Sequence, residues 1–227
     1  MERKEAIRSA YRLTGGNSFY DGMITCTTLS GRAVCRLVWD INKAECDAYL
    51  EKALSGIPDD FSGKLLEVPV GTGILTAPVY QTLPRADITC LDYSPDMMGQ
   101  AQEKADRLHL KNVTFQQGDV GALPYEDDTF DVVLSLNGFH AFPDKEAAYR
   151  EVFRVLRPGG TFCGCFYVMG GHRRTDWFVR HVYEKAGFFT PPYETVSSLK
   201  ARLDGMYADV DMGNLKSMAW FVCRKAG

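Results

Sequence analysis

The stretch that decides the fold is LLEVPVGTGILT, residues 65–76. Its short apolar run meets a carboxylate at Glu67 and passes into a glycine turn, which is typical of a β-strand leading into a ligand-binding turn. Pro69 stands where a glycine would be expected. Because proline fixes φ near about −65° and has no N–H, either this position needs neither a positive φ nor a donor, or the turn is remodelled. We favour the first alternative, since Gly71 and Gly73 remain for a close approach to the ligand.

From residue 64 onward, apolar runs and helical patterns alternate. This alternation predicts a doubly wound α/β fold with a mostly parallel, seven-stranded sheet, a Rossmann-like arrangement. The Ser94-Pro95 pair predicts a capped helix start, and Gly213-Asn214 predicts the turn of an antiparallel C-terminal hairpin that closes the sheet edge. The predicted strands are 64–69, 86–91, 112–117, 130–136 and 160–168, and the predicted helices are 73–83, 95–108, 144–156 and 174–186.

An N-terminal helical cap precedes this domain. Helical spacing predicts helices over 2–13 and 40–54, the second beginning at Asp40 as its N-cap. We therefore expect a cap segment over 1–60 and a ligand-binding domain over 61–227.

Composition excludes several classes of protein. The 227 residues carry a formal net charge of −3 and no long run of basic residues, which argues against a nucleic-acid partner. No apolar run has the ~20 residues that a membrane span requires, and no signal-peptide core is present, so we expect a cytoplasmic protein. The seven cysteines are scattered, and Cys163 and Cys165 fall on one face of a predicted strand; we expect buried, reduced thiols and no metal site. The sequence does not specify an oligomeric state.

Polar residues stand at successive strand ends, where ligands bind in open parallel sheets. Asp92 ends the second strand and can accept hydrogen bonds from both hydroxyls of a ribose. Asp119 and the Val120 N–H end the third strand and could read an adenine. Each has a simpler reading, because Asp92 could start a helix and Asp119 could be a turn residue. Together they favour a nucleoside ligand.

Two cofactor classes compete for such a site. A dinucleotide fingerprint requires a third glycine after Gly71 and Gly73, and Thr76 stands there instead. S-adenosylmethionine has no pyrophosphate, and Glu67 would suit its cationic amino-acid end. The sequence therefore favours S-adenosylmethionine over NAD.

The motifs together resemble a class I S-adenosylmethionine-dependent methyltransferase. They are LEVPVGTG, LDYSPDMM, GDVGALPYEDDTFDVVLSLNGFHAF and REVFRVLRPGG, in this order between residues 64 and 168. The N-terminal YDGMITCTTLSGRAVCRLVW is similar to a pattern of the ubiquinone/menaquinone C-methyltransferase group. In that group the segment helps cover the cofactor, which implies a cofactor contact for Tyr20. The NGFHAF sequence after the fourth strand departs from that group's pattern.

The resemblance also implies a set of cofactor contacts. Glu67 and the glycine turn would approach the methionine portion, Asp92 would hold the ribose, and Asp119 with Val120 would read the adenine. Tyr93 and Met97 would flank the adenine ring. The complete predicted cofactor set is Tyr20, Glu67, Pro69, Gly71, Gly73, Asp92, Tyr93, Met97, Asp119, Val120 and Asn137.

The predicted reaction is methyl transfer to a small-molecule acceptor by in-line displacement, which requires alignment and exclusion of water. His140 is the candidate general base, because an ordinary pKa near about 6.5 permits proton transfer at neutral pH. Its simpler reading is a histidine packed in the core. A largely apolar acceptor pocket is predicted from Tyr20, Phe139, Phe142, Tyr167, Met169 and His172. The alternatives are a quinone-precursor C-methyltransferase, a nucleotide-dependent oxidoreductase and a non-catalytic S-adenosylmethionine-binding protein.

Overall fold

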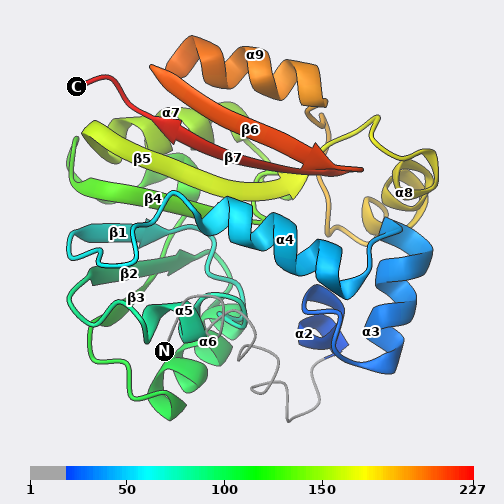
Figure 1. The fold of residues 1–227 in the computed structure, drawn as a ribbon, viewed down its shortest axis with the longest axis horizontal. Coiled ribbons are helices and arrows are strands. Elements are labelled where there is room, and N and C mark those ends of the chain that lie inside the picture. The colour runs from blue at the N-terminus through cyan, green and yellow to red at the C-terminus, as the bar shows by residue number, and fades with distance from the viewer. Residues whose placement is uncertain (1–18) are drawn as a thin grey trace.

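A computed structural model describes residues 19–227 of the chain. The helix predicted over 2–13 lies outside the described residues. Figure 1 shows a twisted sheet with helices on both of its faces and a helical cap at one end.

The sheet has seven strands in the order β3-β2-β1-β4-β5-β7-β6. The five strands β1 to β5 run parallel to one another, whereas β7 runs antiparallel to both β5 and β6. This confirms the predicted doubly wound sheet and its C-terminal hairpin. The strands are β1 (Lys64–Glu67), β2 (Asp87–Asp92), β3 (Val113–Gln117), β4 (Phe130–Leu136), β5 (Leu156–Tyr167), β6 (Asp209–Leu215) and β7 (Met218–Arg224).

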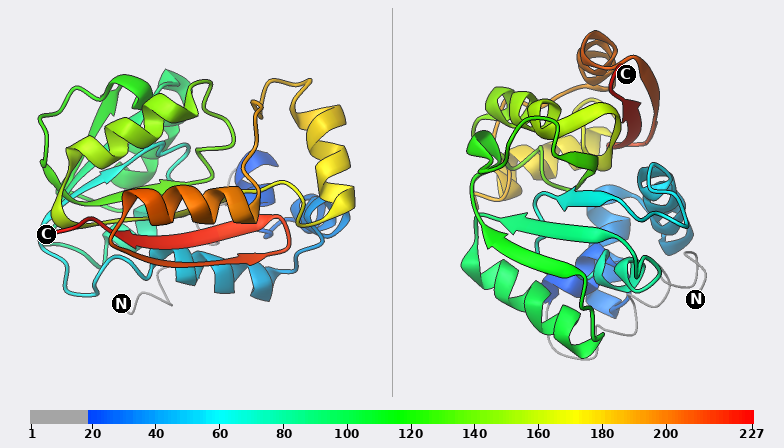
Figure 2. Two further views of the ribbon diagram at one scale, coloured as in Figure 1. Left: turned by 90° about the horizontal axis from the view of Figure 1, so that it is seen from above. Right: turned by 90° about the vertical axis from the view of Figure 1, so that its left-hand side faces the viewer.

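Helices cover the two faces of this sheet in separate groups (Figure 2). One buried cluster joins a sheet face to α4 (Lys43–Leu54), α5 (Ala77–Tyr80) and α6 (Pro95–Arg107). The other joins the opposite face to α7 (Lys145–Val155) and α9 (Val196–Met206). Burial on both faces explains why strands such as β4 are nearly continuous apolar runs.

The cap consists of short helical segments beside the carboxyl ends of the strands. They are α2 (Phe19–Ile24), α3 (Leu29–Val34), the π-helical η2 (Cys35–Trp39), α8 (Arg173–Phe178) and the π-helical η4 (Val179–Tyr183). Cys26 and Cys35 form a disulfide between the α2–α3 connection and η2. The expectation that all cysteines are reduced is therefore wrong for this pair, which the cap's fold brings together; the five remaining cysteines are buried thiols.

The predicted helix over 73–83 is reduced to the single turn α5. Pro78 lacks an N–H and is tolerated only in the first turn of a helix, so a helix that includes it begins just before it. The predicted start of α4 was also wrong. Asn42 caps this helix and forms a capping box with Glu45, while Asp40 adopts a left-handed conformation that ends η2.

The hairpin turn also lies later than predicted. Gly213 pairs with Trp220 inside the hairpin, and the chain reverses at Lys216-Ser217, where Lys216 has a φ of 52°. A Cβ at Gly213 would lie 2.7 Å from the Trp220 ring, so this glycine makes room for the indole rather than for a turn. The predicted helix 174–186 is present as α8 followed by η4, and α9 was not predicted. Within residues 19–227, no helix combines the length and the apolar character needed to cross a bilayer.

Candidate functional site

The candidate site lies where β1 and β4 are neighbours and the chain winds away from them in opposite directions. This switch point is where ligands bind in open α/β sheets. A pocket of about 60 Å³ opens there. Its lining comes from Glu67 at the end of β1, from the following turn Pro69–Thr76, from Leu136 and Asn137 at the end of β4, and from Ile24 of α2.

The glycine turn has the conformation that its sequence predicts. Gly71 and Gly73 have φ values of 55° and 67°, which side chains with a Cβ rarely adopt. A Cβ on Gly71 would project into open space, so this residue leaves room beside the pocket. A Cβ on Gly73 would lie 3.1 Å from the Ala101 Cβ, so this glycine lets the turn pack against α6.

Pro69 lies in the pocket wall, after a cis peptide bond from Val68. Its Cδ lies 2.3 Å from the place that a Cβ would take on Gly138. The proline ring therefore packs against the backbone that follows β4 and joins the two walls of the pocket.

Glu67 is almost completely buried, with 1% of its surface exposed. Its Oε2 accepts hydrogen bonds from the Tyr80 hydroxyl at 2.7 Å and the Thr76 hydroxyl at 3.0 Å, and the Cys90 thiol lies 3.6 Å away. No described residue donates to the other oxygen, Oε1. Burial raises the pKa of Glu67 from its ordinary value of 4.5 to about 8, although the three donors oppose this change. A carboxyl beside a pocket, with no cationic partner among the described residues, suits a cationic ligand.

Asp92 is tied to the glycine turn. Its Oδ2 accepts a hydrogen bond from the Gly71 N–H at 2.8 Å, and its Oδ1 accepts one from the Ser94 N–H at 2.9 Å. Burial raises the pKa of Asp92, opposed by these backbone donors. Ser94, and not Asp92, caps α6, as the Ser94-Pro95 pair predicted. The Tyr93 N–H also acts on the Asp92 carboxylate, which as an acceptor of up to about four hydrogen bonds can still accept from a ligand.

The predicted adenine contacts lie on the connections after β2 and β3, apart from the pocket lining. Tyr93 is 76% exposed, Met97 is partly buried, and Val120 is buried in the core. The exposed Asp119 caps the short 3-10 turn η3 (Val120–Ala122) and accepts from the Gly121 N–H at 2.8 Å. The simpler turn reading of Asp119 therefore holds in this structure, and its contact with adenine stays a prediction.

The geometry of His140 argues against a base at the pocket. The side chain does not line the pocket, and its Nδ1 faces the Tyr167 N–H at 3.3 Å. Its ring stacks on Phe189 at 4.0 Å. Burial, with a smaller contribution from Lys145, lowers the pKa of His140 from 6.5 to about 3. The expectation of an ordinary pKa was wrong because the side chain is desolvated.

Asn137 lies at the pocket, as predicted. Its φ of 56° is left-handed, a conformation that asparagine tolerates better than most residues. Its N–H donates to the Cys165 carbonyl at 2.7 Å, which fixes the end of β4 against β5.

Sequence reasoning missed the contact that holds the cap on the glycine turn. Asp21 of α2 accepts a hydrogen bond from the Thr72 hydroxyl at 2.6 Å and forms an ion pair with Lys104 of α6 at 3.0 Å. Both charged side chains are at most 7% exposed. The motif around Tyr20 predicts that this segment helps cover the cofactor, and α2 brings Ile24 to the pocket. The side chain of Tyr20 itself lies outside the described part of the structure.

The residues predicted to line an acceptor pocket do not form one wall. Phe139 is a core residue, 1% exposed, whose ring contacts Tyr149 at 4.3 Å. Tyr167 is also buried and donates its hydroxyl to Asp176 at 2.8 Å. The prediction for these two side chains was wrong, because the strand ends bury them under the cap and α7.

An aromatic cluster fills the space under the cap instead. Trp39 stacks on Tyr183 at 5.9 Å and contacts the ring of Tyr167 edge-on at 6.0 Å. Phe189 stacks on Tyr183 at 5.3 Å, opposite His140. This cluster lies between the carboxyl end of β5 and the segments η2 and η4.

Comparison with known proteins identifies the domain. Residues 65–160 match the methyltransferase domain family. A probable phthiotriol/phenolphthiotriol dimycocerosates methyltransferase of Mycobacterium ulcerans is 43% identical over 104 residues, which are 45% of this chain and 39% of that protein. A demethylmenaquinone methyltransferase of Thermus thermophilus is 38% identical over 97 residues, 43% of this chain and 44% of that protein. The chain thus spans less than half the length of either relative.

The fold extends beyond the matched segment. A phosphoethanolamine N-methyltransferase of Haemonchus contortus, solved with phosphomonomethylethanolamine and S-adenosylhomocysteine, superposes with a TM-score of 0.68 at 15% identity. The superposition covers 93% of this chain and 61% of that one. Residues 65–160 are therefore a methyltransferase domain, and the chain as a whole has the fold of class I S-adenosylmethionine-dependent methyltransferases and resembles the quinone methyltransferases.

Proposed function

We propose that this protein is an S-adenosylmethionine-dependent methyltransferase with a small-molecule acceptor. The observation that carries the proposal is the pair of buried carboxyls, Glu67 and Asp92, on either side of one glycine turn at the switch point. Glu67 lines the pocket and has no cationic partner among the described residues. Asp92 holds the turn by accepting a hydrogen bond from the Gly71 N–H.

The residues present fit this cofactor. The Oε1 atom of Glu67 would accept from the cationic amino group, and the remaining acceptor capacity of Asp92 would hold the ribose. Gly71 leaves open the space that a Cβ would fill, which permits the close approach of a ligand. A cation beside Glu67 also favours the ionised carboxylate, so binding is expected to release a proton near neutral pH.

S-adenosylmethionine supplies a methyl group on a sulfonium, which an acceptor can take by direct displacement. The protein then has to align the two reactants and exclude water. Asp21, Thr72 and Lys104 hold α2, and with it Ile24, against the glycine turn. Because His140 is buried with a lowered pKa, we assign it no role as a base in this proposal.

A second candidate narrows the acceptor to a quinone precursor methylated on carbon. The relatives named above are, by their names, methyltransferases of demethylmenaquinone and of phthiotriol/phenolphthiotriol dimycocerosates. The N-terminal YDGMITCTTLSGRAVCRLVW pattern also favours this group. A cytoplasmic location stays a prediction of the sequence.

Calorimetry with S-adenosylhomocysteine and its 2′-deoxyribose analogue tests the proposal. We expect the parent protein to bind S-adenosylhomocysteine and to bind the analogue at least tenfold more weakly, since a charge-assisted hydrogen bond contributes roughly 1.5 to 3 kcal/mol. Asp92→Asn should bind both weakly and lose this discrimination. NAD should give no comparable heat.

The discrimination separates ligand binding from folding, because a variant that is merely less stable would still prefer the ribose form. Discrimination by Asp92→Asn equal to that of the parent would remove Asp92 from the ribose site. Tight binding of NAD to the parent would instead favour the oxidoreductase alternative. Turnover of demethylmenaquinone-type and unrelated acceptors, measured as S-adenosylhomocysteine formation, tests the acceptor class.

A further inference from the structure

Exposed apolar side chains gather on one part of the cap. Six large apolar side chains are exposed among those that the structure describes, and five of them lie on two segments, 29–39 and 173–188. Trp177 is 54% exposed and Phe188 is 64% exposed. The five are Leu29, Leu37, Trp177, Val182 and Phe188, and we call the surface that they form with the neighbouring basic residues the cap face.

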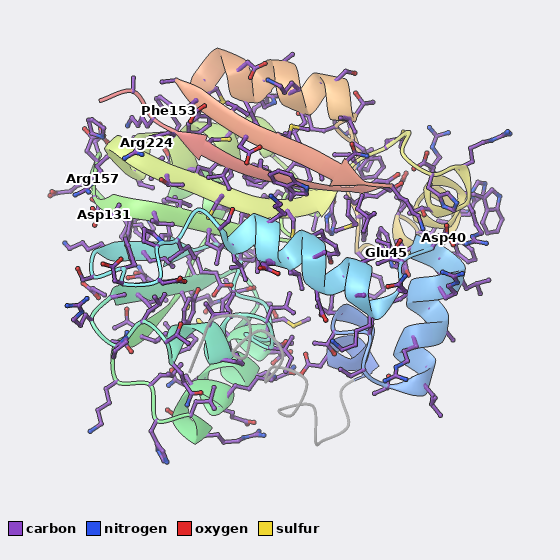
Figure 3. All side chains as sticks on the ribbon, viewed as in Figure 1. Asp40, Glu45, Asp131, Phe153, Arg157 and Arg224 are labelled. Carbon is purple, nitrogen blue, oxygen red and sulfur yellow. A yellow bond between two sulfur atoms is a disulfide. The ribbon has the colours of Figure 1, made fainter. Side chains whose placement is uncertain are left out.

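The two segments form one continuous surface. Figure 1 shows α3 and α8 at the same end of the molecule, and η2, which continues α3, contacts α8. The Thr175 hydroxyl donates to the Val38 carbonyl at 2.7 Å, and the Arg174 guanidinium donates to the Arg36 carbonyl at 3.1 Å. Asp40, labelled in Figure 3 where the two segments meet, pairs with Arg174 at 3.3 Å.

The exposed charged side chains of the two segments are basic, and Asp40 between them is paired with Arg174 and Lys216. Segment 29–39 contains no acidic residue, and Arg32 and Arg36 are exposed there. On the other segment, Arg173, Arg180 and Lys185 are exposed.

The acidic residues of the second segment, Asp176 and Glu184, accept hydrogen bonds from neighbouring groups of the protein. Asp176 accepts from the Tyr167 hydroxyl at 2.8 Å and from the Gly170 N–H at 3.0 Å. Glu184 accepts from the Tyr193 hydroxyl at 3.1 Å. A chain with a net charge of −3 therefore presents apolar and basic side chains together on this face.

We propose that the cap face binds peripherally to a membrane surface that carries anionic lipids. Exposed Trp, Phe and Leu side chains beside Arg and Lys are the combination that inserts into the boundary between headgroups and acyl chains. A second copy of the chain fits less well, since it would bring like charges together. The face adjoins the aromatic cluster through Trp39 and Tyr183.

Vesicle flotation of the whole chain tests the proposal. Vesicles of phosphatidylcholine alone are compared with vesicles that also contain phosphatidylglycerol, at low and high salt. We expect binding to the anionic vesicles only, weakened by salt because the attraction of basic residues to the surface is screened. The Arg173→Glu/Lys185→Glu variant should bind at least tenfold more weakly.

The apolar part of the face has its own variant and control. Trp177→Ser/Phe188→Ser should also lose at least tenfold in binding, and Tyr93→Ser, which removes the sixth exposed residue outside the cap face, should bind like the parent. All altered side chains are exposed, and circular dichroism checks that each variant is folded.

Absence of binding to any vesicle, equal binding to both kinds of vesicle, or salt-insensitive binding would overturn the proposal. Concentration-dependent self-association lost in both cap-face variants would assign the face to a second copy. None of these outcomes depends on cofactor binding, so calorimetry with S-adenosylhomocysteine remains a separate test of the proposed function.

Discussion

Glu67→Gln removes the acid at the pocket and keeps the shape of the side chain. The amide oxygen can take the place of Oε2 and accept from Tyr80 and Thr76, while the amide nitrogen takes the place of Oε1. The fold should therefore keep its hydrogen bonds, and the change should appear in the dependence of stability on pH.

The magnitude follows from the pKa of Glu67. In the unfolded chain the carboxyl ionises above pH 4.5, whereas in the folded protein burial keeps it protonated up to about pH 8. Between these values the folded state holds one more proton, so the free energy of unfolding falls as the pH rises. The two pKa values differ by about 3.5, and a difference of one pKa unit corresponds to about 1.36 kcal/mol. The full difference therefore amounts to about 5 kcal/mol. Below pH 4.5 and above pH 8, Glu67 adds no further dependence.

Urea denaturation of the cofactor-free protein between pH 5 and pH 8.5 measures this effect. The free energy of unfolding of Glu67→Gln minus that of the parent should grow by about 4 kcal/mol over the range, because pH 5 already lies above the unfolded-state pKa of 4.5. Glu126→Gln, which replaces an exposed carboxylate, is the matched control and should show no such growth. A difference that stays constant within about 1 kcal/mol across the range would refute the reasoning.

Two further predictions concern the cap and the buried histidine. Asp21→Asn leaves Lys104 buried without its carboxylate and should lower the free energy of unfolding, measured by urea denaturation, by about 3 to 5 kcal/mol. The double variant Asp21→Asn/Lys104→Met should regain part of this loss, because it no longer buries an unpaired charge. An equal loss in the single and the double variant would exclude the ion pair as the cause. Burial lowers the folded pKa of His140 from 6.5 to about 3, so this group contributes a loss of stability as the pH falls from 6.5 towards 3. The free energy of unfolding of His140→Gln minus that of the parent should therefore grow as the pH falls over this range, measured by acid denaturation. An unchanged acid limb in that variant would show that His140 does not control it.

Much of the fold followed from local patterns in the chain. The start of α6 at Ser94-Pro95, the bounds of β4 and the positive φ values of Gly71 and Gly73 all depend on backbone geometry and on residues within a few positions. One error also had a local cause that the sequence contains, since Pro78 forbids the helix that was predicted through it. The sequence also indicated that the ends of β1 and β4 would meet at the pocket, whereas the residues that it placed there after β2 and β3 lie outside the pocket lining.

The chemistry of those residues depended on neighbours that are distant in sequence. Asp21 meets Thr72 across 51 positions, and Glu67 meets Cys90 across 23. His140 has a histidine's ordinary chemistry in the sequence and a much lower pKa in the fold, because packing under the cap removes its water. The sequence by itself determined the order of strands and helices and the place of the glycine turn, since these depend on periodicity and backbone sterics. Only the tertiary structure decided which side chains are desolvated, which charges are paired and which apolar residues stay exposed, because each of these depends on what the rest of the chain packs against them.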